Sequence, residues 1–402
     1  MKHIQYLLIL FLLIILFTPH NIFADISVDA DFPGGNIMVD KIEGDQIFLH
    51  QDLRDTKGDW FYWYFRVRGA EGRSLTFNFT KSRAIGVRGS AMSLDKGKNW
   101  SWLGNDAVNQ QSFHYNFPAS ASAVRFCFAM PYLESKLKSF LKAYQKHPNL
   151  KIETLCQSKK QRKIELLRAG RLDGQCDHRV MLTCRHHACE MMANYSLEGL
   201  IDTILSDSDD GQWFRDHVEF LLIPFVDKDG VEDGDQGKNR IPHDHGRDYA
   251  KESIYPSVKT IRKFVPQWSQ GKLHLAIDMH CPYISGSNNE NLFFVGSPAP
   301  HNWENIEQFS EILESVQRGP LIFDKKNNIP YGQGWNTAAN YGSGKSCGKW
   351  AAELPEIWLG TSVEIPYANA NGHAVTAKTA RQFGKDMAAA IRIFLEKNQT
   401  HY

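Results

Sequence analysis

Three uninterrupted apolar runs constrain the fold of this chain more than any other feature. They are HRVMLTC (178–184), HVEFLLIPFV (217–226) and KLHLAIDMH (272–280). A strand with one face in water alternates apolar and polar side chains, whereas a strand covered on both faces is apolar throughout. Helical patterns separate or follow these runs, as at EGLIDTIL (198–205) and in the amphipathic stretch 375–397. We therefore expect the α/β class, with an α/β/α domain around a mixed, mostly parallel sheet.

The segment before this domain has a different pattern. It contains aromatic and β-branched runs and no long helical period; the runs are WFYWYFRVRG (60–69), SLTFNFT (74–80) and SAVRFCFAM (122–130). A small β-sandwich is the simplest way to bury two apolar sheet faces. We interpret the aromatic density as sandwich core rather than as a ligand platform. The expected domains are an all-β sandwich at 25–131 and the α/β/α domain at 132–402.

The first 24 residues have a positive start, then a short apolar run, then the small residue Ala24. This pattern is typical of a secretory signal peptide, and the run is short for a membrane span. We expect residues 1–24 to be removed. That predicts an exported protein, periplasmic or secreted, with no stable membrane insertion after cleavage. An uncleaved membrane anchor is the alternative.

Charge and cysteine content narrow the possible partners. The 402 residues carry a formal net charge of +1, which gives no reason to expect nucleic acid or an anionic membrane surface as a partner. None of the seven cysteines forms a CxxC pair. A zinc site built from cysteines is therefore not expected.

The end of the first apolar run carries a candidate metal site. The segment RHHACE (185–190) places His187 three residues before Glu190, which puts both on one face if a helix has begun there. A neutral imidazole and a carboxylate are both good zinc ligands, and a third ligand is needed. His280 is the best candidate, because it ends another apolar run and sites lie at the carboxyl ends of such strands. His186 with Glu190, four residues apart, is geometrically possible too, and surface or capping roles are the alternative.

Three later stretches add polar groups that suit catalysis. The segment 225–249 presents Arg240 and Arg247, whose planar guanidinium groups suit an anionic carboxylate. Tyr341 precedes a small-residue loop, which can move over a site. Glu364 lies in a short β-like run, and a buried carboxylate beside a metal-bound water is the usual general base. Taken singly, these stretches are equally explained as a solvated acidic turn, a glycine-rich turn and an outward-facing strand residue.

Taken in order, the motifs resemble the zinc carboxypeptidases related to carboxypeptidase A. The similarity is strongest to the cytosolic carboxypeptidases and their bacterial relatives, which carry a small β-sandwich before the catalytic domain. The motifs that carry the resemblance are RHHACE (185–190), GKNR (237–240), DHGRDY (244–249), DMH (278–280) and SVEIP (362–366), together with Tyr341.

The resemblance implies one zinc ion per chain. His187 and Glu190 are its first two ligands and His280 is the last. Asp244 then orients a zinc-bound histidine.

The same resemblance implies roles for the remaining residues. Glu364 is the general base, and Arg240 polarises the scissile carbonyl. Arg247 holds the C-terminal carboxylate of the substrate, and Tyr341 closes on it. The family has an asparagine immediately before this arginine, but this chain has Gly246, so one contact to the substrate carboxylate is missing or replaced.

The function implied is zinc-dependent hydrolysis of the last peptide bond of peptides or proteins, through a metal-activated water. One alternative is a zinc amidohydrolase that acts on cell-wall stem peptides or N-acyl amino acids. A second is a catalytically inactive peptide-binding protein whose aromatic β-domain binds a partner or a glycan.

Overall fold

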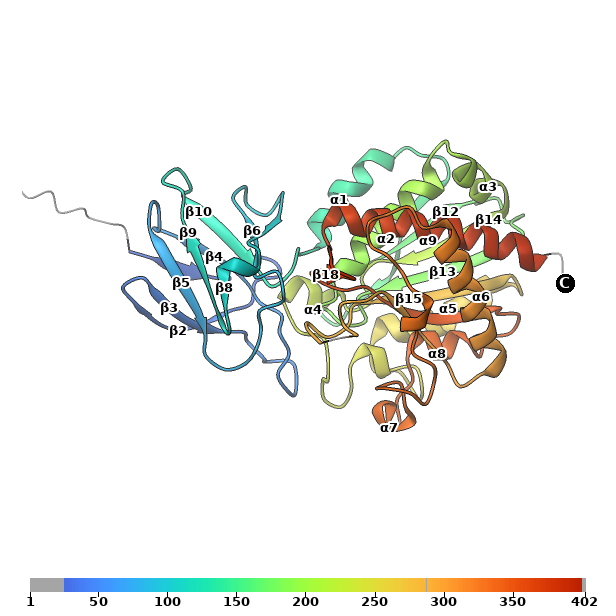
Figure 1. Ribbon diagram of the computed structural model, residues 1–402. Helices are drawn as coiled ribbons and strands as arrows, with labels where there is room; N and C mark the ends of the chain where they lie inside the picture. The colour runs from blue at the N-terminus through green and yellow to red at the C-terminus, as the bar shows by residue number, and fades with distance from the viewer. Residues whose placement is uncertain (1–24, 287, 400–402) are drawn as a thin grey trace, which may run out of the picture.

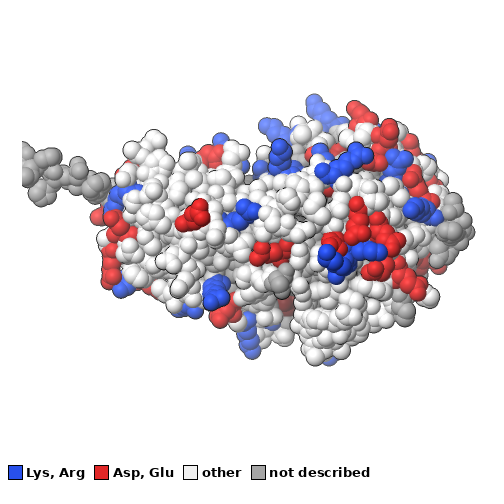
Figure 2. Space-filling model, in the orientation of Figure 1, with Lys and Arg blue, Asp and Glu red and all other residues white. Residues whose placement is uncertain are grey.

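The computed structural model describes residues 25–286 and 288–399, so the expected signal peptide at 1–24 lies outside the described residues. An all-β part precedes a larger α/β part, as Figure 1 shows. Figure 2 shows acidic and basic side chains interspersed on the same face of the molecule. Within the described ranges, no helix combines the length and the apolar character needed to cross a bilayer.

The all-β part consists of two five-stranded sheets. Their facing sides bury a cluster of aromatic rings that includes Trp63, Phe77 and Phe126. Alternating strands such as SLTFNF, whose second, fourth and sixth residues are buried, explain why a sandwich forms. The first sheet runs β1 (Ser27–Asp29), β4 (Tyr64–Arg68), β10 (Ala123–Cys127), β6 (Ala91–Ser93) and β7 (Ser101–Trp102). The second runs β2 (Met38–Glu43), β3 (Gln46–His50), β5 (Ser74–Phe79), β9 (Ser112–Asn116) and β8 (Val108–Asn109).

The aromatic run 60–69 is a strand only from Tyr64 to Arg68. Within the preceding residues 60–63, Tyr62 bonds to the α/β part instead of to a neighbouring strand. The N–H of Tyr62 donates to the side-chain oxygen of Gln236 at 2.7 Å, and the amide of Gln236 donates back to the carbonyl of Tyr62 at 2.9 Å. The run therefore consists of a connecting segment followed by a strand.

The α/β part is built on a seven-stranded mixed sheet, as expected from the apolar runs. The four central strands are parallel, and the strands beyond them pair antiparallel. Continuous burial along the central strands matches their apolar composition. In sheet order the strands are β11 (Leu150–Gln157), β12 (Lys163–Gly170), β14 (Val218–Ile223), β13 (His178–Cys184), β15 (Leu273–His280), β17 (Leu359–Glu364) and β16 (Phe293–Val295).

Helices cover both faces of this sheet, which gives the expected α/β/α layers (Figure 1). Val180 and Leu182 of β13 belong to the core under α2 and α9, whereas Met181 between them belongs to the core under α5 and α8. The helices are α1 (Glu134–Leu141), α2 (Met192–Leu205), α3 (Asp209–His217), α4 (Lys228–Asp233), α5 (Pro256–Ser269), α6 (Pro300–Val316), α7 (Ala338–Tyr341), α8 (Cys347–Ala351) and α9 (Ala377–Gln399). A two-stranded ribbon, β18 (Asn369–Ala370) and β19 (His373–Ala374), precedes α9.

The hydrophobic core is continuous from the sandwich into the α/β part. The rings of Phe61 and Phe128 lie 5.5 and 4.9 Å from the ring of Tyr367. The division at residue 131 stays a prediction based on composition.

The parallel register places the carboxyl ends of three neighbouring strands at one edge. Cys184 of β13 pairs with Met279 of β15, and His280 of β15 pairs with Glu364 of β17. The polar side chains at and just after these strand ends therefore meet at the carboxyl edge of the sheet.

Candidate active site

Two histidines and one glutamate converge at this edge. His187 and Glu190 follow β13, and His280 is the last residue of β15. The Nδ1 atoms of His187 and His280 lie 2.9 and 2.7 Å from the two carboxylate oxygens of Glu190. All three side chains are buried, and their donor atoms lie within 4.8 Å of one another. Two imidazoles and a carboxylate suit a catalytic zinc ion.

The local structure around Glu190 differs from the expectation. Helix α2 begins at Met192, so Glu190 lies in a turn before the helix rather than in its first turn. In that turn the N–H of Glu190 donates to the carbonyl of His187 at 3.2 Å. The buried guanidinium of Arg185 holds the turn by donating to the carbonyl of Ala188 at 2.9 Å. A turn thus brings the two donors together as a helix would have done.

Carboxylates face the outer ring nitrogens of both histidines. Nε2 of His280 lies 2.6 Å from Asp278, and Nε2 of His187 lies 3.6 Å from Asp244. Burial acts to raise the pKa of Asp244, but the hydrogen bond and charge of His187 bring that pKa well below its usual value. An imidazole that donates its Nε2 proton to a carboxylate leaves Nδ1 free to bind a metal. The donor set therefore fits zinc in protonation as well as in position.

His186, the alternative partner of Glu190, points elsewhere. Its Nδ1 lies 2.7 Å from Asp278 and its Nε2 lies 2.8 Å from the hydroxyl of Tyr249. Both ring nitrogens are thus engaged by other groups. This geometry favours His187 over His186 as the donor beside Glu190.

Glu364 ends β17 and lines the same cavity as His187 and His280. Its side chain is buried, and Oε2 has no hydrogen-bond partner among the described residues. Burial, opposed by the charge of His280 and reinforced by that of Glu190, raises the pKa of Glu364 to about 7. A buried carboxylate with a free oxygen is the group expected of a general base.

The cavity measures about 380 Å³ and has a cationic end. Arg247 donates to the carbonyl of Gly246 at 3.2 Å, and its guanidinium lies 4.6 Å from the ring centre of Tyr341. No carboxylate of the described residues forms an ion pair with Arg247. The Nζ atom of Lys349 lies 3.1 Å from the same Tyr341 ring. This end of the cavity is therefore suited to an anionic group.

Gly246 itself has a steric explanation. A Cβ atom at this position would lie 2.6 Å from Nε2 of His187 and 3.3 Å from Asp244. The chain passes directly against the imidazole here, so no side chain fits without moving the histidine. Position 246 therefore supplies no side chain for the substrate contact that the resemblance implies.

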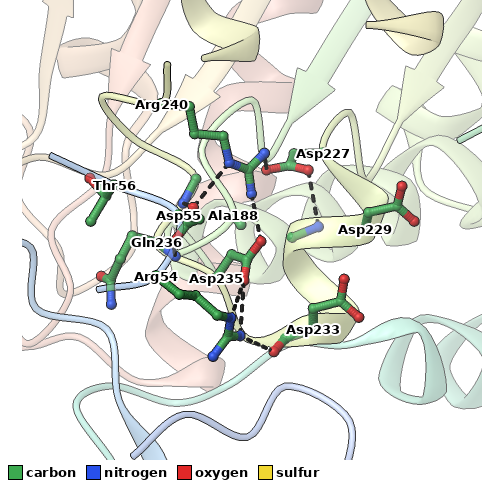
Figure 3. A network of polar contacts seen from close by, with 12 residues as sticks. Arg54, Asp55, Thr56, Ala188, Asp227, Asp229, Asp233, Asp235, Gln236 and Arg240 are labelled. Carbon is green, nitrogen blue, oxygen red and sulfur yellow. Dashed lines mark hydrogen bonds and ion pairs between the residues drawn. The ribbon is translucent and has the colours of Figure 1, made fainter. Parts of the chain in front are cut away.

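Arg240 lies outside the cavity, which corrects the role that the resemblance implied. Its guanidinium donates to Asp55 at 3.0 Å, to Asp227 at 2.6 Å and to Asp235 at 2.9 Å (Figure 3). Burial acts to lower the pKa of Arg240, but the charges of these three carboxylates raise it. Each of the three guanidinium nitrogens donates to a carboxylate, and Arg240 does not line the cavity, so it is not placed to reach a substrate carbonyl there.

Several cavity residues were missed in the sequence, among them Lys238 and Trp60. Lys238, two positions before Arg240, does line the cavity, and its Nζ lies 2.8 Å from Oε1 of Glu190. Trp60, from the aromatic run of the sandwich, lines it too. The presence of a second cation in the same loop was a visible signal for Lys238. Nothing in the pattern of 60–69 distinguishes a cavity residue from a core residue.

The fold and the donor set resemble those of one class of protein. An α/β/α sheet with a His–Glu–His set at its carboxyl edge is the arrangement expected of the zinc carboxypeptidases. Residues 137–291 match the family model described as zinc carboxypeptidase.

Relatives in sequence are named cytosolic carboxypeptidases. Cytosolic carboxypeptidase 3 of Mus musculus is 25% identical over 305 residues, which cover 67% of this chain and 30% of the mouse protein. Cytosolic carboxypeptidase 6 of Caenorhabditis elegans is 23% identical over 302 residues, which cover 67% of this chain and 64% of the worm protein. The match thus covers less than two thirds of each relative's own length.

Two of the relatives in structure are bacterial metallo-carboxypeptidases. The metallo-carboxypeptidase of Burkholderia cenocepacia has a TM-score of 0.74 at 21% identity and covers 93% of this chain and 100% of its own. The metallo-carboxypeptidase of Pseudomonas aeruginosa has a TM-score of 0.71 at 20% identity and covers 92% and 99%. The similarity in fold therefore includes both the sandwich and the α/β part.

Proposed function

We propose that this chain is a metallocarboxypeptidase that removes the C-terminal residue of peptides or proteins, with one zinc ion per chain. The observation that supports this most is a convergence in one cavity. The donor set around Glu190, the free carboxylate oxygen of Glu364 and the unpaired guanidinium of Arg247 all face the same space. The first two groups suit hydrolysis, and the third suits the free carboxylate of a chain end.

Each of these groups has a separate role in the hydrolysis. Zinc held by His187, Glu190 and His280 would polarise a water molecule and the carbonyl under attack. Glu364 accepts the proton of the attacking water and passes it to the leaving amine. Its free Oε2, held in the cavity without a competing partner, is available to that proton.

Substrate selection rests on the cationic end of the cavity. Arg247 donates parallel hydrogen bonds to the terminal carboxylate, and the ring of Tyr341 lies against the guanidinium on one side. Because Gly246 brings no side chain, the arginine carries more of this recognition than it does with an asparagine neighbour. Selection for a free chain end therefore depends chiefly on one ion pair.

The test compares the wild type with Glu364→Gln on two peptides of one sequence, ending in a free carboxylate or in an amide. We expect the wild type to release the last residue from the acid alone. Glu364→Gln keeps its zinc content but lowers kcat by about 10³-fold, within the usual contribution of a general base. Glu43→Gln, an exposed change on β2, is the matched control. Unchanged turnover by Glu364→Gln, or equal cleavage of both peptides, would contradict the proposal.

The missing side chain at Gly246 favours one alternative substrate class. With one contact to the chain end absent, N-acyl amino acids or cell-wall stem peptides fit the same zinc chemistry as an amidohydrolase. A panel of acyl amino acids and muropeptides separates the two. Faster turnover of either class than of plain peptides would favour the amidohydrolase.

We also propose that the protein is exported, periplasmic or secreted. The support is the apolar run and small residue within positions 1–24. Cell fractionation with N-terminal sequencing of the mature chain tests this. An intact N-terminus in the cytosolic fraction would contradict it.

A further inference from the structure

The cavity contains a cation that the family resemblance did not assign. Lys238 reaches into it, with Nζ 2.8 Å from Oε1 of Glu190 and 4.7 Å from the ring centre of Trp60. Its side chain is only 17% exposed. It therefore stands beside the metal-binding carboxylate and shares the cavity with Glu364.

Arg240 cannot take over this position without a large penalty. Turning its guanidinium into the cavity would leave Asp55, Asp227 and Asp235 without their shared cation. Asp227 is almost completely buried, and an unpaired buried carboxylate is strongly destabilising. Lys238 is thus the cation of this loop that faces the reaction space.

A loop of the sandwich holds the backbone around Lys238. Asp55 accepts from the N–H of Gln236 at 3.0 Å and from the N–H of Gly237 at 2.8 Å. The hydroxyl of Thr56 donates to the carbonyl of Lys238 at 2.5 Å. Figure 3 shows Asp55 lying between this backbone and Arg240. The sandwich therefore fixes the segment from which the lysine projects.

The same segment is pressed against the turn that carries the metal donors. Gly237 has φ +74, and a Cβ there would lie 2.1 Å from the backbone nitrogen of Ala188. Only glycine allows this approach and this backbone conformation. As a result the backbone of Lys238 lies beside the His187–Glu190 turn, and its side chain contacts Glu190 directly.

We propose that Lys238 is a catalytic residue that polarises the scissile carbonyl, and that Asp55 of the sandwich is its positioning residue. This inference rests on the proposed carboxypeptidase function. In peptide hydrolysis the carbonyl oxygen gains negative charge as water adds to the carbon, and the largely buried ammonium of Lys238 would stabilise that charge. The residue is thus expected to act on kcat more than on KM.

The first experiment measures kcat, KM and zinc content for Lys238→Met and Lys238→Arg. We expect Lys238→Met to lower kcat about 100-fold, as loss of one oxyanion donor does, with KM changed less than about threefold. Lys238→Arg restores most of the activity because it restores the charge. Lys41→Met, an exposed lysine of β2, is the control. Zinc content stays at the wild-type level throughout, which separates a catalytic effect from loss of the metal.

A second readout does not need turnover. A phosphonate peptide, whose charged oxygens imitate the tetrahedral state, binds Lys238→Met about 100-fold more weakly than wild type, whereas a product amino acid binds both equally. Wild-type kcat and wild-type phosphonate affinity in Lys238→Met would overturn the catalytic assignment. Loss of zinc in this variant would overturn it too, because the lysine would then be supporting Glu190.

The positioning role of Asp55 is tested by a double-mutant cycle. Asp55→Asn lowers kcat about tenfold alone but adds nothing in the Lys238→Met background, because both act through one ammonium. Thr56→Val provides a second, milder change of the same backbone. Additive effects on kcat would overturn the positioning role. A zinc-loaded wild type that cleaves no peptide removes the proposed function itself, whereas an active wild type with an equally active Lys238→Met removes only this inference.

Discussion

Substitution of Gly246 by alanine should weaken zinc binding without any change to a zinc ligand. Gly246 has no left-handed φ, so its backbone accepts alanine. The added Cβ would lie 2.6 Å from Nε2 of His187, about 1 Å inside a normal contact distance. The imidazole must turn or shift, and its alignment with Asp244 is lost.

The expected loss of zinc affinity can be worked out from the contact between His187 and Asp244. Loss of an outer carboxylate partner of a metal-bound histidine usually weakens metal binding 10- to 100-fold, or about 1.4–2.7 kcal/mol. We expect a loss in this range for Gly246→Ala. Thermal stability of the zinc-free protein should change little, because His187 lines the cavity and its imidazole can shift into that space.

The assay is competition for zinc against a chromophoric chelator at neutral pH. Gly86→Ala is the matched control, because a Cβ there meets Ile284 at an ordinary 3.5 Å. Wild-type zinc affinity in Gly246→Ala would refute the reasoning, since it would mean that His187 moves freely or does not bind the metal. A loss of affinity equal to that of Gly86→Ala would refute it as well.

Two further predictions concern stability. Arg240→Met leaves Asp55 and the buried Asp227 without their cation, whereas Asp235 keeps its ion pair with Arg54, so the free energy of unfolding in urea should fall by about 3 kcal/mol; an unchanged midpoint would show that the cluster contributes nothing. Burial and the charge of His178 lower the pKa of His274 to about 4. His274 therefore takes up a proton near pH 6.5 in the unfolded chain but only near pH 4 in the folded chain. Its contribution to stability is fully present above about pH 6.5 and is lost as the pH falls towards 4. The loss should be roughly 1–2 kcal/mol after allowance for the partial exposure of this side chain. His274→Gln should flatten this part of the stability–pH curve, and the same slope in both proteins would contradict the assignment.

The central strands of the α/β part were predictable because strands buried on both faces consist mostly of apolar residues. HRVMLTC and KLHLAIDMH became β13 and β15 with nearly the expected bounds. Parallel pairing then brings their carboxyl ends together, so His280 could be placed near His187 without further information.

The loop 235–240 was harder to predict, because spacing in a loop does not determine which side chain faces inward. Asn239 has a left-handed φ of +50 between Lys238 and Arg240, which separates the directions of the two cations. Arg240 donates a hydrogen bond to Asp55, which lies 185 residues earlier in the chain and in the other part of the molecule. A contact between positions so far apart leaves no periodic signal in the sequence.

The continuous core has a consequence for how this protein melts. Rings of Phe61 and Phe128 share Tyr367 with the α/β part, so neither side keeps its packing when the other is lost. Calorimetry should show one cooperative transition rather than two separate ones, because the energetic unit extends across residue 131. Expression of either half by itself would expose these rings to water and favour aggregation.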